Sequence, residues 1–347
     1  MVRTLDTVKG LLEQDGVDVL VISPADFRTI PCPTYPEIRL AIGAAKGVAR
    51  RMDAYGADAI HIATEGPLGL AARRYCLRRG LAFTTAYHTK FPEYVNVRSG
   101  LPLAWGYGFM RWFHKPASGV MVAAATLEEE LCAHGFKNLK RWSRGVDLEL
   151  FKPGAKDAVA ALNALPRPLL LYVGRVAVEK NIGAFLELKT TGTKVVVGDG
   201  PQRDQLERDY PEVVFTGAKH GEDLADHYRA ADVFVFPSRT DTFGLVMLEA
   251  LACGVPVAGY PVPGPLDVVG AQGKGTVPEF IQPVGALDHD LSQAVERARH
   301  ARPEDCRRYA LYYGWPACAT RFVDNLVWAS NGQPVERGAP VPLAALG

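Results

Sequence analysis

The 347-residue sequence predicts an α/β protein built from two doubly wound domains. Short, continuous apolar runs rich in β-branched residues alternate with amphipathic stretches along most of the chain, which is typical of parallel strands covered on both faces. The alternation starts again after a proline-containing stretch in mid-chain. The length also suits two domains, at roughly 150 residues per domain.

The predicted elements follow one another in the order that such folds require. The chain begins with a helix over Thr4–Gln14. Nine apolar runs predict strands: Val17–Ile22, Ala59–Ile62, Ala82–Ala86, Gly119–Ala123, Leu169–Val173, Lys194–Val197, Val213–Thr216, Val233–Phe236 and Val255–Ala258. Between them, helical patterns cover Gly69–Arg79, Thr126–Ala133, Gln202–Asp209, Glu222–Arg229 and Gly244–Ala252. Strands that alternate with helices indicate a parallel sheet in each domain.

The domain boundary is expected in Leu148–Pro168, which carries three prolines and no strong strand pattern. Residues 1–150 therefore form the first Rossmann-like domain and residues 165–314 the second. Two such domains in tandem leave a central cleft, and ligands bind there at the carboxyl ends of the strands. Residues 331–347 are rich in proline and glycine and are expected to be disordered.

The start of the chain departs from the usual pattern. A doubly wound domain normally opens with a strand, whereas here a helix comes first, so the first strand of the N-terminal domain is expected to be missing. A parallel sheet without that strand would leave a neighbouring strand unpaired. We therefore expect a truncated version of a longer protein, whose upstream coding region would add about 15–20 residues.

Composition narrows the class of protein. The net charge of +1 argues against a nucleic-acid partner, and the six scattered cysteines, with no CxxC pair, argue against a disulfide or zinc framework. No apolar run approaches the roughly 20 residues of a membrane span, and no signal peptide pattern opens the sequence. A cytoplasmic protein is expected.

The first half of the sequence is basic. Residues 1–152 carry 20 Lys and Arg against 15 Asp and Glu, a net +5. Four arginines cluster in one helical pattern (Arg73, Arg74, Arg78 and Arg79), and Met110–Lys115 mixes aromatic residues with cations. Such mixtures favour an anionic membrane surface, which would place the protein peripherally on the inner face of the membrane. The alternative is a solvated charged face beside a packed aromatic helix.

The most informative stretch is Asp232–Pro256, where a buried strand leads through a polar loop into a helix. The backbone N–H groups of the first helical residues are suited to bind a diphosphate: Gly244, Leu245 and Val246. Asp241 lies in the loop, and Glu249 follows eight positions later. Alternatively, Asp241 only caps the helix and Glu249 is only solvated.

Two further loops follow predicted strands. After Leu169–Val173, Arg175 and Lys180 supply two cations that could neutralise a diphosphate leaving group, although loop cations are often simply solvent-facing. Val195–Pro201 (VVVGDGP) turns through two glycines. A lone GxG is weak evidence for a nucleotide, since most such turns are only tight turns.

Taken in order, these motifs resemble those of the retaining glycosyltransferases of family 4. The order is GR-x4-K, then G-x-GP, AD-x-F-x-FPS, and D-x-FG followed by LEA-x-ACG-x-PV. Glu65–Leu70 (EGPLGL), Tyr87–Tyr94 (YHTKFPEY) and Ser143–Asp147 (SRGVD) are similar to signatures of that family's first domain. The resemblance spans Val2–Trp328 and is greatest to bacterial α-mannosyltransferases and glycolipid synthases, including sulfoquinovosyl- and glucosyl-diacylglycerol synthases.

The resemblance implies the GT-B fold and a role for each candidate residue. Arg175 and Lys180 would hold the donor diphosphate, and the N–H groups of the helix start would contact sugar and phosphate. Asp241 would contact the transferred sugar and Glu249 the nucleotide ribose. His88 would match the family's active-site histidine. The first acidic position is often Glu in the family, so Asp241 implies a changed sugar preference.

The implied function is transfer of a mannose- or glucose-type hexose from a GDP- or UDP-linked donor to a lipid or glycolipid. The first domain would bind the acceptor and the second the nucleotide sugar, while residues 315–330 would form a helix that crosses back to the first. Transfer would be metal-independent, on one face of the sugar, and without a cofactor other than the donor. Two alternatives remain: a sugar-nucleotide epimerase of the same fold, and a non-catalytic nucleotide-sugar binder.

Overall fold

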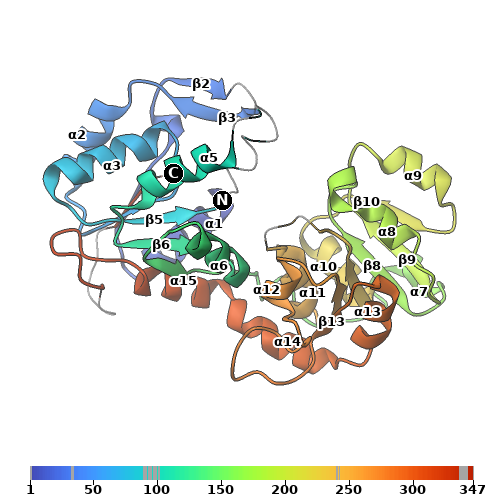
Figure 1. The fold of residues 1–347 in the computed structure, drawn as a ribbon. Helices are drawn as coiled ribbons and strands as arrows, with labels where there is room; N and C mark the ends of the chain where they lie inside the picture. Colours follow the sequence, from blue (N-terminus) through green and yellow to red (C-terminus); the bar gives the residue numbers. More distant parts are fainter. Residues whose placement is uncertain are drawn as a thin grey trace. The chain divides into compact units, whose positions relative to one another are not determined.

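The structure is a computed structural model that describes residues 2–32, 35–88, 92, 96, 100, 102–239, 241, 243–335 and 343–346. The chain divides into two compact units. The first unit consists of Met1–Ser143 and Cys318–Gly347, and the second of Arg144–Ala317. Figure 1 shows the chain coloured along its sequence. Every helix in the described residues is too short or too polar to reach across a lipid bilayer.

The first unit is a parallel six-stranded sheet covered by helices. Its strand order is β1-β14-β4-β5-β6-β7. The strands are β1 (Val19–Ile22), β14 (Leu343–Leu346), β4 (Ala59–Ile62), β5 (Thr84–Tyr87), β6 (Gly119–Val122) and β7 (Leu139–Arg141). The helices are α1 (Val2–Gln14), α2 (Ala45–Tyr55), α3 (Pro67–Arg79), α5 (Leu103–His114) and α6 (Ala125–Ala133). A separate antiparallel hairpin, β2 (Thr29–Cys32) with β3 (Tyr35–Ala41), was not predicted.

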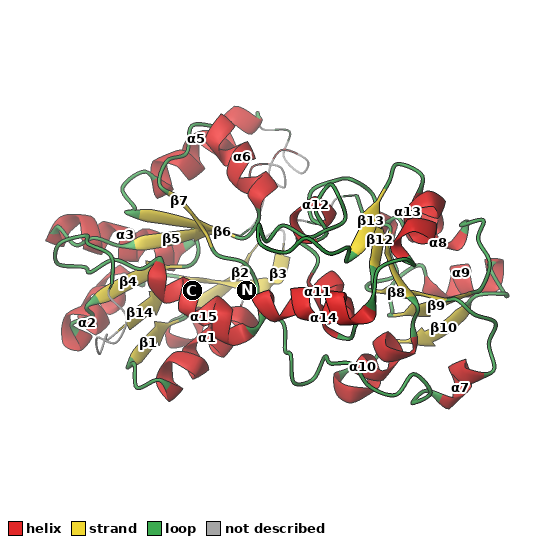
Figure 2. Cartoon of the chain, turned by 90° about the horizontal axis from the view of Figure 1, so that it is seen from below, coloured by secondary structure: helices red, strands yellow, loops and turns green. Residues whose placement is uncertain are grey.

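Strand β14 corrects two expectations about the ends of the chain. The tail was expected to be disordered, and the first sheet was expected to leave a strand unpaired. Instead β14 lies between β1 and β4 and pairs with both in parallel, with Leu343 opposite Val19 on one side and Ala59 on the other. Figure 2 shows it in this inner position. Backbone pairing on both sides satisfies the N–H and C=O groups that an open position would leave without partners.

The second unit is also a parallel six-stranded sheet, in the order β10-β9-β8-β11-β12-β13. Its strands are β8 (Leu169–Val173), β9 (Thr193–Val197), β10 (Val214–Gly217), β11 (Val233–Phe236), β12 (Val257–Gly259) and β13 (Gly285–Leu287). Its helices are α7 (Ala160–Asn163), α8 (Ile182–Leu186), α9 (Arg203–Asp209), α10 (Gly221–Ala230), α11 (Leu245–Ala252), α12 (Pro265–Val268), α13 (Leu291–Ala298) and α14 (Pro303–Ala310). Fully buried valines of β9 and β11 pack against Phe185 of α8 in the core. The predicted α/β class with parallel sheets is therefore confirmed.

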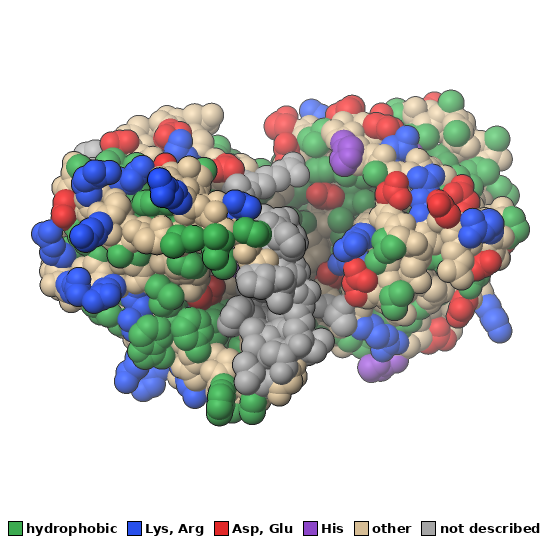
Figure 3. All heavy atoms as spheres, turned by 90° about the horizontal axis from the view of Figure 1, so that it is seen from above, with side chains coloured by type: hydrophobic (Ala, Val, Ile, Leu, Met, Phe, Trp, Pro, Cys, Tyr) green, Lys and Arg blue, Asp and Glu red, His purple; other side chains and the backbone are tan. Residues whose placement is uncertain are grey.

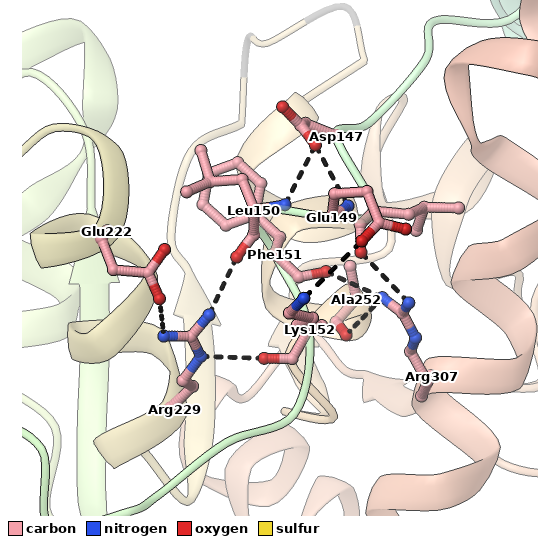
Figure 4. A network of polar contacts seen from close by, with 10 residues as sticks. Asp147, Glu149, Leu150, Phe151, Lys152, Glu222, Arg229, Ala252 and Arg307 are labelled. Carbon is pink, nitrogen blue, oxygen red and sulfur yellow. Dashed lines mark hydrogen bonds and ion pairs between the residues drawn. The ribbon is translucent and has the colours of Figure 1, made fainter.

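The boundary between the units falls between residues 143 and 144, and not at residue 150 as expected. Two arginines explain this by binding the backbone of the predicted linker (Figure 4). Arg229 of α10 donates to the carbonyl oxygens of Leu150 and Lys152, both at 2.9 Å. Arg307 of α14 donates to those of Leu148 (3.1 Å) and Phe151 (2.8 Å). Four carbonyl bonds thus fix residues 148–152 to the second unit.

The second crossing between the units lies within helix α15 (Trp315–Asp324), at residues 317 and 318. The helix was expected over residues 315–330 but ends at Asp324. Its second half belongs to the first unit, where Phe322 packs against the rings of His61 and Trp142, at centroid distances of 5.0 and 4.8 Å. The chain therefore returns to the first unit in this helix.

Candidate functional site

The predicted donor site lies at the carboxyl edge of the second sheet. Strands β8 and β11 are neighbours at its centre, with Val233 opposite Leu170. Because both strands run in the same direction, the loops that follow them (residues 174–181 and 237–244) emerge at the same edge. This is the edge at which open parallel sheets bind ligands.

Close backbone packing shapes the loop that follows β8. Val176 N–H donates to the carbonyl of Asp199, in the loop after β9, at 2.9 Å. A Cβ atom on Gly198 would lie 1.8 Å from the carbonyl oxygen of Gly174, and one on Gly200 would lie 2.4 Å from that of Val176. No side chain fits at either position. The G-x-G pattern is therefore explained by contact between two loops and needs no nucleotide to account for it.

Lys180 and Asp241 come together from these two loops. The Lys180 Nζ lies 2.5 Å from Asp241 Oδ1, and the two side chains are 28% and 26% exposed. Asn181 Nδ2 donates to the carbonyl of Pro237 at 3.0 Å, which ties the same loops together. The structure thus places a cation and a carboxylate side by side at the sheet edge, half-buried and within reach of a ligand.

A buried tyrosine lies behind this pair. The hydroxyl of Tyr172, on β8, donates to the carbonyl of Arg175 at 2.8 Å. Burial, and to a smaller extent the charges of Asp241 and Glu179, raises the pKa of the Tyr172 phenol above its usual range. The phenol therefore stays protonated and keeps the start of the loop in place. No sequence pattern had singled out Tyr172.

Helix α11 begins beside Asp241. Its N-cap is Gly244, in the left-handed region at φ 78°. A Cβ atom there would lie 2.7 Å from Met247 Cε, so glycine is required by both conformation and space. The N–H groups of Leu245 and Val246 in the first turn have no acceptor within the helix, and the helix dipole favours an anion at this end.

Glu249 lies one turn into α11, and its carboxylate accepts a hydrogen bond from a buried tyrosine. The hydroxyl of Tyr228, on α10, donates to Glu249 Oε2 at 2.8 Å. Tyr228 is fully buried, and burial together with the charge of Glu249 raises its pKa well above the usual value. The carboxylate is therefore oriented by a protonated phenol, and the reading of Glu249 as only solvated is wrong. Tyr228 carries no signal in the sequence that would have identified this contact.

Arg175 is less closely joined to the other candidates. Its side chain is 65% exposed and its Nη1 lies 3.7 Å from Glu179 Oε1, four residues further along the loop. The described residues also include Arg239, in the loop after β11, whose guanidinium lies 3.8 Å from the ring centroid of Tyr260. Sequence reasoning had not singled out this further cation, although it lies only three residues after the buried strand β11.

The first unit carries the remaining candidate. His88 directly follows β5 and is partly buried, with its ring edge-on to Trp142 at a centroid distance of 5.7 Å. Most of the YHTKFPEY motif that singled it out lies outside the described residues. Beyond the carboxyl end of the neighbouring strand β4, Glu65 Oε1 lies 3.2 Å from His114 Nε2, and His114 Nδ1 lies 2.9 Å from Thr85 Oγ1. This buried group was not predicted.

The charged groups at the edge of the second sheet suit an anion better than a metal ion. Among the described residues, no three His, Cys, Asp or Glu side chains gather as they would to hold a metal ion. The charged groups in the loops after β8 and β11 are instead three cations, Arg175, Lys180 and Arg239, and two carboxylates, Glu179 and Asp241. This arrangement offers cations and backbone N–H groups to an anionic ligand.

Comparison with known proteins decides the family. Residues 1–150 match the family model described as Glycosyltransferase Family 4, and residues 167–299 match that of Glycosyl transferases group 1. A GDP-mannose-dependent alpha-mannosyltransferase of Mycobacterium tuberculosis is 32% identical over 287 residues, which cover 80% of this chain and 74% of that protein. The chain belongs to glycosyltransferase family 4. The resemblance predicted from the motifs is confirmed.

Further relatives of this family 4 glycosyltransferase have related names. A GDP-mannose-dependent alpha-mannosyltransferase of Mycolicibacterium smegmatis is 30% identical over 90% of this chain and 89% of its own length. A sulfoquinovosyl transferase of Arabidopsis thaliana is 27% identical over 90% of this chain and 67% of its own.

Solved structures show the same fold. A sucrose-phosphate synthase of Thermosynechococcus elongatus matches with a TM-score of 0.61 and 26% identity, over 80% of this chain and 75% of that one. HepE of Anabaena, solved in complex with UDP, matches with a TM-score of 0.63 and 16% identity, over 90% and 87% of the two chains. The predicted GT-B fold is confirmed.

Proposed function

We propose that the chain is a retaining hexosyltransferase that moves a mannose- or glucose-type sugar from a nucleotide-diphosphate donor to a lipid or glycolipid acceptor. The observation that carries the proposal is the pair of Lys180 and Asp241 beside the N-terminus of α11, at the carboxyl edge of the second sheet. A cation, a helix start and a carboxylate at one place suit a ligand that joins a diphosphate to a hydroxyl-rich sugar.

In this proposal the second unit binds the donor. Lys180 and Arg175 neutralise the diphosphate together with the first-turn N–H groups of α11, Leu245 and Val246. Charge that develops on the departing nucleotide is stabilised by these fixed groups, which is the role a divalent cation has in other transferases. Transfer would therefore need neither a metal ion nor a cofactor.

Carboxylates orient the two ends of the donor. Asp241 accepts hydrogen bonds from hydroxyls of the transferred sugar, and Glu249 accepts from the ribose hydroxyls. The bond from Tyr228 holds the Glu249 carboxylate in place for this role. Because Asp241 is one carbon shorter than the glutamate frequent in the family, the sugar hydroxyl that it reaches is expected to differ.

The chemical step is a same-face substitution. The bond between the anomeric carbon and the diphosphate oxygen breaks, and a bond from that carbon to the acceptor oxygen forms on the same face. The acceptor's proton passes to the departing phosphate oxygen, so no carboxylate nucleophile is required. His88 is proposed to lie near the donor sugar and hydrogen-bond to it.

The names of the relatives support a lipid acceptor. They include the sulfoquinovosyl transferase described above and an alpha-monoglucosyldiacylglycerol synthase of Streptococcus pneumoniae, 27% identical over 87% of this chain. We propose that this chain likewise glycosylates a lipid, at the cytoplasmic surface of an anionic membrane, and that it has no nucleic-acid partner.

The test offers a panel of donors to the purified protein with a total lipid extract. GDP-mannose, UDP-glucose, UDP-glucuronate and UDP-galactose are supplied singly, and products are identified by mass spectrometry. We expect one donor to yield a glycolipid, with an α-anomeric signal in NMR spectra and an unchanged rate in EDTA. A β-linked product would contradict retention, and loss of activity in EDTA would contradict metal independence.

A parallel reaction without lipid separates the alternatives. Conversion of a donor to a new isomer in the absence of any acceptor would indicate an epimerase. Binding of the nucleotide in calorimetry with no turnover of any donor would indicate a non-catalytic binder. Either result would overturn the proposed transferase reaction.

A further inference from the structure

A buried chain of three polar side chains reaches the edge of the first sheet. Thr85 of β5 and His114 at the end of α5 are 0% and 2% exposed, whereas the side chain of Glu65 is 22% exposed. His114 Nδ1 lies 2.9 Å from Thr85 Oγ1, and its Nε2 lies 3.2 Å from Glu65 Oε1. An external ligand can therefore reach this chain at the carboxylate of Glu65 and not at the hydroxyl of Thr85.

The order of burial distinguishes the three side chains from the nucleophilic triads of hydrolases. In such a triad the hydroxyl faces the substrate, and the carboxylate is buried behind the histidine. Here the hydroxyl of Thr85 is fully buried and the carboxylate of Glu65 is partly exposed. His114 is therefore placed to orient a carboxylate, and it does not present an activated hydroxyl to a substrate.

The hydrogen bonds of His114 fix how the carboxylate is held. A carboxylate only accepts hydrogen bonds, so Nε2 of His114 carries the hydrogen and donates to Glu65. The Thr85 hydroxyl can donate to Nδ1, which gives both ring nitrogens a partner. Three aromatic rings lie around the imidazole, at centroid distances of 5.0 to 6.0 Å: Tyr87, Phe113 and Phe136. The donor behind the carboxylate is therefore fixed in position.

The loop that carries Glu65 is also fixed. It connects β4 to α3, and a Cβ atom on Gly69 of α3 would lie 1.8 Å from the carbonyl oxygen of Thr64. Only glycine lets the helix pack this close to the loop. Because β4 and β5 are paired neighbours in a parallel sheet, Glu65 emerges at the same sheet edge as His88. Open parallel sheets bind their ligands at this edge.

No Lys or Arg side chain of the described residues pairs with Glu65. Figure 3 shows Lys and Arg side chains over much of one face of the first unit. One of them, Arg141, lies 2.8 Å from Glu128, whereas the ion-pair partner of Glu65 is the imidazole of His114. A carboxylate can accept about four hydrogen bonds. Glu65 therefore keeps the capacity to accept from a ligand that donates hydrogen bonds.

We propose that Glu65 binds hydroxyl groups of the acceptor, and that His114 and Thr85 position it for this role. The proposal rests on the proposed transferase reaction, in which the first unit binds the acceptor. The ligand class is a glycerol or sugar headgroup, whose hydroxyls are uncharged donors that suit a carboxylate. The second unit holds Glu249 in a similar way, through the buried hydroxyl of Tyr228. Each sheet thus has a carboxylate with a buried donor behind it.

The test measures transfer while the concentrations of acceptor and donor are varied in turn, with the pair that the donor panel identifies. Glu65→Gln keeps the size of the side chain and removes its charge. We expect the KM for the acceptor to rise about tenfold and the KM for the donor to stay unchanged, because a hydrogen bond to a charged group is lost at the acceptor. Glu129→Gln, which removes an exposed carboxylate from α6 of the same unit, is the matched control and should leave both KM values unchanged. An unchanged acceptor KM in Glu65→Gln would overturn the proposal.

A double-mutant cycle tests the positioning role of His114. His114→Leu should raise the acceptor KM, and its combination with Glu65→Gln should be no worse than Glu65→Gln alone, because the histidine acts only through the carboxylate. His114→Gln, whose amide can still donate to Glu65, should restore most of the affinity. Losses that multiply in the double variant would overturn the positioning role.

Thr85→Val keeps this role testable if the His114 variants do not fold, because valine has nearly the shape of threonine. It should raise the acceptor KM about threefold, through loss of one neutral hydrogen bond behind the histidine. Thermal unfolding checks that each variant folds. A normal acceptor KM in a folded Thr85→Val would overturn the part of the proposal that concerns Thr85.

Direct binding separates this proposal from the proposed reaction. Saturation-transfer NMR compares the unchanged protein with Glu65→Gln, and the soluble probes are hexyl α-D-glucoside and 1-O-hexylglycerol. Probe binding that Glu65→Gln weakens, with no transfer from any donor by the unchanged protein, would overturn the transferase reaction and support the hydroxyl site. Transfer by the unchanged protein, with equal probe binding by the two proteins or none by either, would overturn the Glu65 site alone.

Discussion

The two sheets of the molecule have the same number of parallel strands but assemble them from the chain in different ways. All six strands of the second sheet come from one continuous stretch, residues 169–287. The first sheet takes five strands from residues 19–141 and completes itself with β14, more than 200 residues later in the chain. A parallel strand can therefore insert between two neighbours in a sheet even when it is distant from both of them in the sequence.

Removal of residues 343–347 should have the largest effect, and on the stability of the first unit. It deletes an inner strand of four residues that pairs on two sides, and at about 1 kcal/mol net for each of up to about eight backbone hydrogen bonds the loss is on the order of 8 kcal/mol. Hydrogen exchange should show faster exchange in β1 and β4 of the first unit, with unchanged protection in β8 and β11 of the second.

Deletion of Gly347 alone is the control, because the four register pairs of β14 with β1 and the four with β4 all remain. If the five-residue deletion leaves β1 and β4 fully protected, the pairing of β14 is contradicted and the contrast between the two sheets disappears.

Lys180→Ala should have the next largest effect, and on activity instead of stability. Loss of a cation that stabilises a departing diphosphate typically lowers turnover on the order of 10²-fold. Lys189→Ala, which removes an exposed cation from the same unit, is the control and should keep a near-normal rate. Turnover is measured with the donor identified in the panel, and thermal unfolding checks that both variants fold. A near-normal rate for Lys180→Ala would contradict the proposed diphosphate site.

A smaller effect is expected when the pH is lowered, and it concerns the stability of the first unit. His61 of β4 is fully buried, and burial lowers its pKa from 6.5 to about 3. The unfolded chain therefore binds a proton between those pH values that the folded chain does not, so stability is complete above pH 6.5 and falls as the pH decreases through this window. Between pH 7 and pH 5 the loss is about 2 kcal/mol.

Denaturant unfolding at the two pH values measures this loss, with unit-specific amides as probes. His61→Gln should remove about 2 kcal/mol of the pH dependence of the first unit, whatever its effect on overall stability. His289→Gln, exposed in the second unit, should leave the pH dependence as it is. Equal pH dependence in the protein and in His61→Gln would refute the role of His61.

The fold of the second unit was largely predictable, because each of its predicted strands is a continuous apolar run that can be recognised from the local sequence. Leu169–Val173 and Val233–Phe236 occur at their predicted bounds, as does Ala59–Ile62 in the first unit, and the other predicted strands differ by one or two residues. The hairpin of β2 and β3 was missed because it contains prolines at positions 31 and 36, and proline within a run of residues argues against a strand. Pro31 is tolerated since the hairpin is a two-stranded edge.

The candidate site likewise has a part that the local sequence predicted and a part that it did not. Lys180, Asp241 and Gly244 follow strands in recognisable motifs, and the structure brings them together. Tyr228 and the pair of Glu65 and His114 were not found, because side chains 21 and 49 positions apart meet only through the fold. The spacing of residues in a motif reflects the local turn, and it does not indicate contacts between elements that are distant in the sequence.

The position of β14 has a consequence for how the protein emerges from the ribosome. Domains generally fold as units, the N-terminal one first during synthesis. Here the second unit can fold as soon as residue 317 has left the exit tunnel, whereas the first sheet waits for residues 343–346. The order of completion is therefore opposite to the order of synthesis. Until β14 emerges, β1 and β4 face an open position between them, and a chaperone that binds extended apolar segments would find its target there.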